Sequence, residues 1–287
     1  MFINDIPNNI SSSIRLFTDD CLLYRKISCQ DDTSILQQDL NTLASWETSW
    51  RMKFHPAKCN ILRITRKKRS LIHNYTLHNH TLETVDSAKY LGVTIDSKLS
   101  WTPHIDNNTA KSHCTLGLLR RNLKNAPTKT KSLAYNTLVQ PNLEYCASVW
   151  DPHTNKDINK IEMVQRRAAR FATNRYHNTS SVSNMLSSLQ WPTLQQRRLN
   201  IRMCMIYKII HNLVAIPQEN YFIPKCRLTP NQHPYTFMQY QPSRDYFKFS
   251  FFPRSIPQWN SLPTAIVTAP SLVSFQNRLV AHQATPI

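Results

Sequence analysis

The spacing of apolar residues changes near residue 102, and this change limits the possible folds most strongly. Before it, short apolar runs alternate with turn residues, which is typical of β-hairpins. From there to about residue 215, apolar residues recur every three or four positions, which is helical spacing. The sequence therefore predicts an α+β fold with three parts: a mixed part at 1–102, a helical part at 103–215 and a Pro- and aromatic-rich extension at 216–287.

The mixed part is expected to contain small strand pairs around one helix. The predicted segments are hairpins at 14–24 and 75–85, a strand at 59–64, a strand pair at 90–95 and 99–101, and a helix at 34–50. On the helix, Leu36, Leu40, Leu43, Trp46 and Trp50 share one face, so both tryptophans are expected in the core rather than as a platform for bases.

Helices dominate the rest of the prediction. They are expected at about 104–124, 128–139, 157–173 and 194–213. Beyond residue 216 the chain shows no sustained period, which predicts an irregular tail closed by a short helix at 271–281.

The charge balance favours a polyanionic partner. The chain has 35 Lys and Arg against 17 Asp and Glu, a net charge of +18, and such an excess is typical of nucleic-acid binding, although a merely soluble basic protein is an alternative. No apolar run approaches the roughly 18 to 20 residues of a membrane span, so no membrane partner is expected. Only two glycines occur, which excludes a glycine-rich phosphate loop.

The cysteines and the amino terminus bear on location. Seven cysteines are scattered without a C-x-x-C spacing, and an odd number argues against a secreted disulfide framework. The first residues show no signal-peptide pattern. The expected location is nuclear or cytoplasmic, not secreted.

Two adjacent carboxylates, Asp19 and Asp20, fall at the tip of the first predicted hairpin, between strands expected to be buried. Hard oxygen ligands fixed in this way suit Mg²⁺. Nucleotidyl transfer uses two such metals about 4 Å apart. The alternative is that the pair belongs to an ordinary solvated turn.

Here the chain resembles the reverse transcriptases of non-LTR (LINE-type, jockey-like) retrotransposons. Phe17-Thr-Asp-Asp20 resembles their palm motif, and further blocks follow in the family's order. These blocks are Asn4 to Pro7, Phe54 to Cys59, Tyr90 to Asp96 with Leu99 to Trp101, Asn142 to Tyr145 with Val149 and Trp150, Val164 to Arg170, and Phe252 to Arg254 with Trp259 to Pro263. The resemblance extends over nearly the whole chain and implies a truncated palm at 1–102 followed by a helical thumb.

The resemblance also implies roles for individual residues. Asp19 and Asp20 would hold catalytic Mg²⁺, Lys58 would neutralise or protonate the leaving pyrophosphate, and Leu91 with Gly92 would approach the primer end. The implied partners are an RNA template and a DNA primer.

The predicted helix at 157–173 carries four basic residues that could follow a nucleic-acid backbone, as a thumb helix would. They are Lys160, Arg166, Arg167 and Arg170. The alternative interpretation is an ordinary solvated helix face. The stretch from Arg66 to Arg69 leaves three possibilities open: a phosphate contact, a nuclear-import signal or a solvated loop.

The chain departs from the family in one important respect. In the family, the first metal-binding aspartate and the nucleotide-binding loop precede the segment that matches Asn4 to Pro7, whereas this chain begins at Met1. Because phosphoryl transfer depends on metal positioning, the chain is expected to be inactive alone. The alternative is a non-catalytic remnant that binds nucleic acid through its basic residues.

Overall fold

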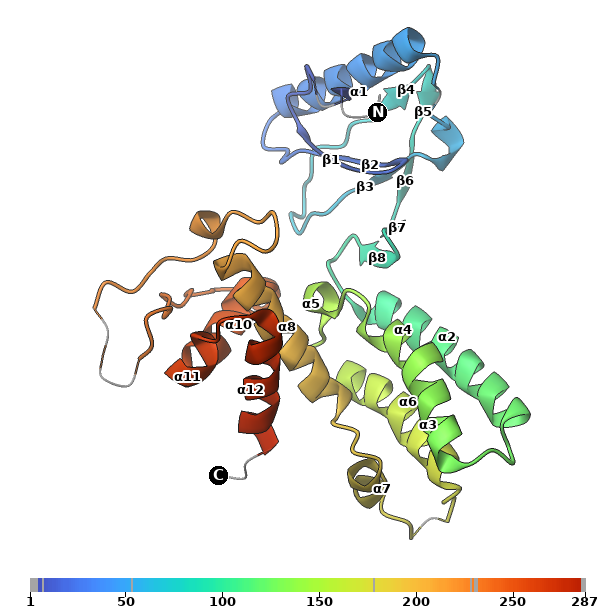
Figure 1. Ribbon diagram of the computed structural model, residues 1–287. Coiled ribbons are helices and arrows are strands. Elements are labelled where there is room, and N and C mark those ends of the chain that lie inside the picture. The colour runs from blue at the N-terminus through green and yellow to red at the C-terminus, as the bar shows by residue number, and fades with distance from the viewer. Residues whose placement is uncertain are drawn as a thin grey trace. The chain divides into compact units, whose positions relative to one another are not determined.

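The computed structural model describes residues 5–6, 8–52, 54–177, 179–227, 229 and 232–284. The fold divides into two compact units, Met1–His104 and Ile105–Ile287, which are described separately below (Figure 1). Asn4 and Pro7, which take part in the resemblance, lie outside the described residues. Helices occur together with small two-stranded sheets, so the expected α+β mixture is present.

The strands of the first unit form four pairs. Their bounds are β1 Ser13–Phe17, β2 Asp20–Tyr24, β3 Asn60–Leu62, β4 Thr76–Leu77, β5 His80–Thr81, β6 Glu83–Val85, β7 Ser87–Tyr90 and β8 Val93–Asp96. Antiparallel pairs join β1 to β2, β4 to β5, and β7 to β8, while β3 pairs with β6 in parallel. The hairpins predicted at 14–24 and 75–85 are confirmed, except that 83–85 leaves the second hairpin to pair with β3.

The third predicted strand pair was wrong. Residues 99–101 form no strand, and β7 pairs instead with β8. Leu91 and Gly92 both adopt positive φ, at 45° and 81°. A two-residue loop with two positive φ values follows the natural twist of a hairpin, so the chain turns back at 91–92 rather than at the expected 96–98.

Helix α1, Gln30–Trp50, covers the small core of this unit. It packs on Tyr75, Leu77 and Leu82, all buried. Two polar side chains of α1 fix it further. Gln37 exchanges two hydrogen bonds of 2.9 Å with the backbone of Thr76, and buried Asp39 accepts from the amides of Ser11 and Ser12. These bonds connect the helix to β4 and to the segment before β1.

The last turn of α1 lies outside the core. Trp46 is half-buried, but Trp50 is 40% exposed, so its predicted core position was wrong. Arg51 ends the helix with a left-handed φ of 55°. The buried side of this turn is occupied by Glu47, which accepts from Phe54 N and contacts His78 Nε2. The chain after the helix therefore packs beside Glu47 rather than beside Trp50.

The second unit is helical. Its helices are α2 Thr102–Asn122, α3 Thr128–Leu138, α4 Gln140–Glu144, α5 Ala147–Trp150, α6 Asn155–Thr173, α7 Val182–Ser188, α8 Leu194–Ile210, α9 Asp245–Lys248, α10 Phe251–Asn260, α11 Thr264–Val267 and α12 Leu272–Ala284. The four long helices predicted for this part correspond to α2, α3, α6 and α8. Helix α8 packs against α4, α5 and α6 on one side and against α10 and α12 on the other. Figure 1 shows it between these two groups of helices.

The extension at 216–287 is less irregular than expected. In the described residues up to Arg244 it forms the 3₁₀ turn Gln218–Asn220 and an isolated antiparallel bridge between Pro224 and Phe237. It then forms α9 to α12. Pro253 and Pro257 obscured α10 in the sequence, yet Pro253 lies in the first turn, where no backbone donor is required. Fully buried Trp259 and Phe275 share a core with α8, which explains the folding of the extension. No helix among the described residues is long and apolar enough to cross a membrane.

Candidate functional site

The Asp-Asp pair lies at a tight turn. Thr18 and Asp19 form a two-residue loop between β1 and β2, and Phe17 pairs with Asp20 across it. Thr18 adopts a φ of 51°, a conformation that β-branched residues rarely take. Its hydroxyl lies 2.7 Å from the Phe17 carbonyl oxygen and 2.9 Å from Asp19 Oδ1, so it donates within the turn and stabilises this conformation.

Both carboxylates are exposed at this turn. The hydrogen bond from the Thr18 hydroxyl lowers the pKa of Asp19. The strands beside it are half-buried rather than buried, since β1 and β2 form a sheet of two strands only. Phe17 itself is 58% exposed. The expectation of buried flanking strands was therefore wrong, and the turn projects from a small sheet.

The donor set suits Mg²⁺ in kind but is small in number. Ionised carboxylate oxygens are the ligands that Mg²⁺ prefers. Among the described residues, however, no group of three or more His, Cys, Asp or Glu side chains is placed to hold a metal ion. Asp19 and Asp20 could supply at most two side-chain ligands from one hairpin, and a two-metal site requires more.

Lys58 lies in the 3₁₀ turn Pro56–Lys58, where its amide donates to the His55 carbonyl oxygen over 2.8 Å. Its side chain is exposed and forms no ion pair with either aspartate within the described part of the chain. The neighbouring Cys59 lies close enough to Cys21 to help burial raise the pKa of Cys21 to about 11. The turn that carries Lys58 therefore lies near the strand that begins at Asp20.

Leu91 and Gly92 form the turn of the β7–β8 hairpin, closed by the pair of Tyr90 and Val93. Gly92 has a φ of 81°, a conformation in which glycine is favoured. The sequence prediction missed His104, which is buried and accepts from the Thr94 amide over 3.2 Å. Burial lowers the pKa of His104, so the ring is neutral and supports β8 as a hydrogen-bond acceptor.

The four basic residues on α6 differ in their surroundings. Lys160 contacts the carboxylate of Asp106 and lies 3.9 Å from Asp157, so its charge is largely balanced. Arg166 and Arg167 are exposed, and Arg170 is half-buried. The structure thus brings the four onto one helix but leaves them unequally available.

Arg167 has a neighbour of its own. Its Nη1 lies 3.3 Å from His113 Nε2 on α2. Burial and the nearby guanidinium lower the pKa of His113, so this contact joins a cation to a neutral ring.

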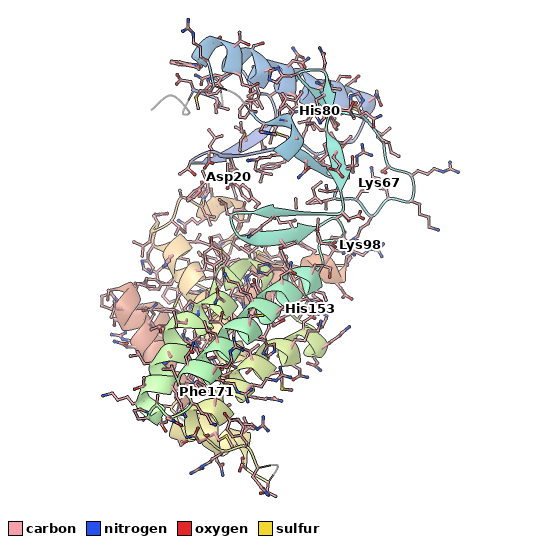
Figure 2. All side chains as sticks on the ribbon, turned by 90° about the vertical axis from the view of Figure 1, so that its right-hand side faces the viewer. Asp20, Lys67, His80, Lys98, His153 and Phe171 are labelled. Carbon is pink, nitrogen blue, oxygen red and sulfur yellow. The ribbon has the colours of Figure 1, made fainter. Side chains whose placement is uncertain are left out.

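The basic stretch at 66–69 lies on an exposed loop between β3 and β4. Figure 2 shows Lys67 on this loop, which extends away from the strands of the first unit. Arg66 Nη2 donates to the Lys98 carbonyl oxygen over 3.0 Å, so one residue of the stretch is used to hold the loop.

A buried ionic cluster in the second unit was not predicted. Asp151 Oδ1 lies 2.7 Å from Arg198 Nε, and Oδ2 lies 3.1 Å from Arg202 Nε and 3.3 Å from Arg254 Nη2. Arg198 is completely buried. Burial and the neighbouring Arg254 lower the pKa of Arg202 to about 10. The cluster joins α5, α8 and α10, and it has more positive than negative charge.

Sequence comparison confirms the resemblance to RNA-directed DNA polymerases of non-LTR transposons. The chain is 32% identical over 162 residues to a protein of Drosophila melanogaster described as the probable RNA-directed DNA polymerase from transposon BS. The aligned region covers 55% of this chain and 18% of that relative. It is 24% identical over 166 residues to the corresponding protein of transposon X-element from the same species, covering 56% and 18%.

A third relative is the RNA-directed DNA polymerase from mobile element jockey of Drosophila funebris. It is 26% identical over 184 residues, covering 59% of this chain and 20% of the relative. The chain thus spans about a fifth of the length of these curated relatives. No family profile matches the chain, and no solved structure does.

Proposed function

We propose that this chain is part of an RNA-directed DNA polymerase of a non-LTR retrotransposon. The supporting observation is the Phe-Thr-Asp-Asp turn, which exposes two adjacent carboxylates, in a chain whose relatives carry that name. Residues 1–102 would then be part of a palm, 103–215 a thumb, and 216–287 a C-terminal extension that packs on the thumb.

In this proposal the residues of the first unit have distinct roles. Asp19 and Asp20 would provide oxygen ligands for Mg²⁺, which in such enzymes activates the attacking hydroxyl and stabilises the leaving phosphate. Lys58 would balance the charge of the pyrophosphate, and Leu91 with Gly92 would contact the primer end. The partners would be an RNA template and a DNA primer, and the seven free cysteines suit a nuclear or cytoplasmic location.

The small number of ligands suggests that the chain needs a further segment to catalyse the reaction. Two carboxylates on one hairpin leave the coordination of two metals incomplete, and positioning of the metals supplies most of the catalysis in phosphoryl transfer. We therefore propose that residues 1–287 alone are inactive and that a longer polypeptide of the same element is active.

A second candidate function is binding of nucleic acid without catalysis. The observation that favours it is the net charge of +18 together with exposed Arg166 and Arg167 on α6. In that case Asp19 and Asp20 would have no metal to hold.

Primer extension on an RNA template with Mg²⁺ tests the two candidates. Residues 1–287, the same chain with Asp19→Ala, and a polypeptide extended upstream in frame would be compared. Asp31→Ala provides a matched control, because it removes another exposed carboxylate of the first unit.

We expect no extension from 1–287, and extension from the longer polypeptide that Asp19→Ala abolishes and Asp31→Ala preserves. Activity of 1–287 that depends on Asp19 would contradict the proposed need for a further segment. Inactivity of the longer polypeptide would favour the non-catalytic candidate.

A further inference from the structure

A basic groove of about 950 Å³ lies in the second unit, where the end of α2 meets the end of α6. Its lining includes three cations, a buried aromatic floor and two residues that follow α6. These are Arg120, Arg121, Lys124, Phe171, Asn174 and Tyr176. No carboxylate is among the lining residues, and none of the four basic residues considered above on α6 lines the groove.

A further positive charge lies beneath the floor. Lys131, on α3, is completely buried, and its ammonium lies 5.2 Å from the centre of the Phe171 ring (Phe171 is labelled in Figure 2). Within the described part of the chain, no carboxylate pairs with Lys131. Because a charge in the interior is weakly screened, Lys131 adds to the positive potential of the three exposed cations above it.

Lys131 also sets the direction of Asn174. Its ammonium donates to Asn174 Oδ1 over 2.7 Å. Since an ammonium has no acceptor, the oxygen of the amide must face it, and the amide nitrogen is left as a donor beside the groove. Asn174 ends α6 with a left-handed φ of 55°, which asparagine tolerates well.

An exposed aromatic ring borders the groove. Tyr176 is 51% exposed, and the guanidinium carbon of Arg120 lies 5.6 Å from its ring centre. A cation over an aromatic face holds the ring in place. Proteins that bind single-stranded nucleic acid combine cations, which contact the phosphates, with aromatic rings, on which the exposed faces of unpaired bases stack. Bases in a duplex have no free face to offer.

We propose that this groove binds single-stranded nucleic acid. Arg120, Arg121 and Lys124 contact its phosphates, and an unpaired base stacks on Tyr176. This site would be an additional binding surface in the helical unit. It rests on the proposed function only for the expectation that the ligand is a nucleic acid. It requires neither the aspartates of the first unit nor polymerisation.

Gly117, on α2, allows a sharp test. A Cβ atom at this position would lie 3.9 Å from Arg121 Nη1, an ordinary contact, so a side chain can begin here without a clash at its first atom. Gly117→Glu places a carboxylate among the three cations, while Gly117→Gln adds the same bulk without charge. Lys156→Gln removes one unit of charge at an exposed position of α6 outside the groove.

The measurement is fluorescence anisotropy of a short labelled oligouridylate with the full chain, after circular dichroism has shown that each variant is folded. Gly117→Glu is expected to weaken binding by about tenfold relative to Gly117→Gln, since one phosphate contact is neutralised and a repulsive charge is added. Lys156→Gln should bind nearly as the unmodified chain. Tyr176→Ala should weaken binding by about tenfold, as the loss of one stacked base implies, and Tyr176→Phe should retain it.

Equal affinity of Gly117→Glu and Gly117→Gln would overturn the assignment of the groove. Unchanged binding in Tyr176→Ala, or duplex RNA bound as tightly as the single strand, would overturn the stacking of an unpaired base. Asp19→Ala should leave this binding unchanged. Failure of the groove and failure of the proposed polymerase function are therefore distinguishable.

Discussion

The ionic cluster around Asp151 predicts that the stability of the second unit depends strongly on this one carboxylate. One carboxylate lies within 3.3 Å of three guanidiniums, and two nitrogens of Arg198 have no hydrogen-bond partner in the described structure. Asp151→Asn keeps the shape of the side chain but removes the only negative charge of the cluster. Buried Arg198 and Arg202 and half-buried Arg254 then remain without a counterion.

The expected loss is large. Removing one partner of a buried ion pair costs about 3–5 kcal/mol, because the remaining charge stays desolvated. A domain of ordinary stability has about 5–15 kcal/mol in total, so the variant should lose a large part of the stability of the second unit. Asp106→Asn is the matched control. Its side chain is 52% exposed in its contact with Lys160, and such surface pairs contribute less than about 1 kcal/mol.

Urea unfolding followed by tryptophan fluorescence measures both variants. Fully buried Trp150 and Trp259 report on the second unit. The midpoint of Asp151→Asn should fall far below that of Asp106→Asn. Adding Arg198→Met to Asp151→Asn should restore part of the loss, since one uncompensated charge is removed. Equal small shifts for Asp151→Asn and Asp106→Asn would refute the reasoning.

Three further predictions concern the pH response and the turns of the protein. Asp32 accepts from the amides of Ser28 and Cys29, which lowers its pKa to about 2. Because this folded pKa lies below the ordinary 3.8, its stabilisation is present above that value and is lost as the pH falls through 2. The difference in urea midpoint between the unmodified chain and Asp32→Asn should therefore shrink over this range, and a constant difference would contradict the assignment. Thr18→Val removes the hydroxyl beside Asp19 and should raise the pKa of Asp19 toward its ordinary value, measured by NMR titration of the carboxyl carbon, where an unchanged pKa would count against the contact. Gly92→Ala should destabilise the β7–β8 hairpin by about 1 kcal/mol because of its positive φ, whereas Gly117→Ala, in a helix, should stabilise by about 0.5–1 kcal/mol, and urea midpoints that move in the same direction would refute this.

The sequence by itself determined the local secondary structure and the similarity to RNA-directed DNA polymerases of transposons. Periodicity placed the first hairpin and the four long helices, because each depends on residues close together in the chain. The Phe-Thr-Asp-Asp turn and the blocks that follow it identified the relatives that comparison confirmed. The net charge followed from composition alone.

Elements whose partners are distant in sequence could not be placed in this way. The parallel pairing of β3 with β6 joins segments more than twenty residues apart, and the residue pattern of neither segment predicts this pairing. Trp50 shares the apolar spacing of α1, yet it is exposed because Glu47 occupies the buried side of that turn. Periodicity shows which face of a helix is apolar, but not how far the core extends along it.

The same limit applies to the charged groups. Lys160 looked like a phosphate contact until the structure placed Asp106, 54 positions away, against it. Asp151 and Arg254 are separated by 103 positions and meet in the interior. The groove at Tyr176 exists only because the ends of α2 and α6 meet. The sequence determined which charges this protein carries, and tertiary packing decided which of them are neutralised, since the energy of a charge depends on neighbours that the order of residues does not reveal.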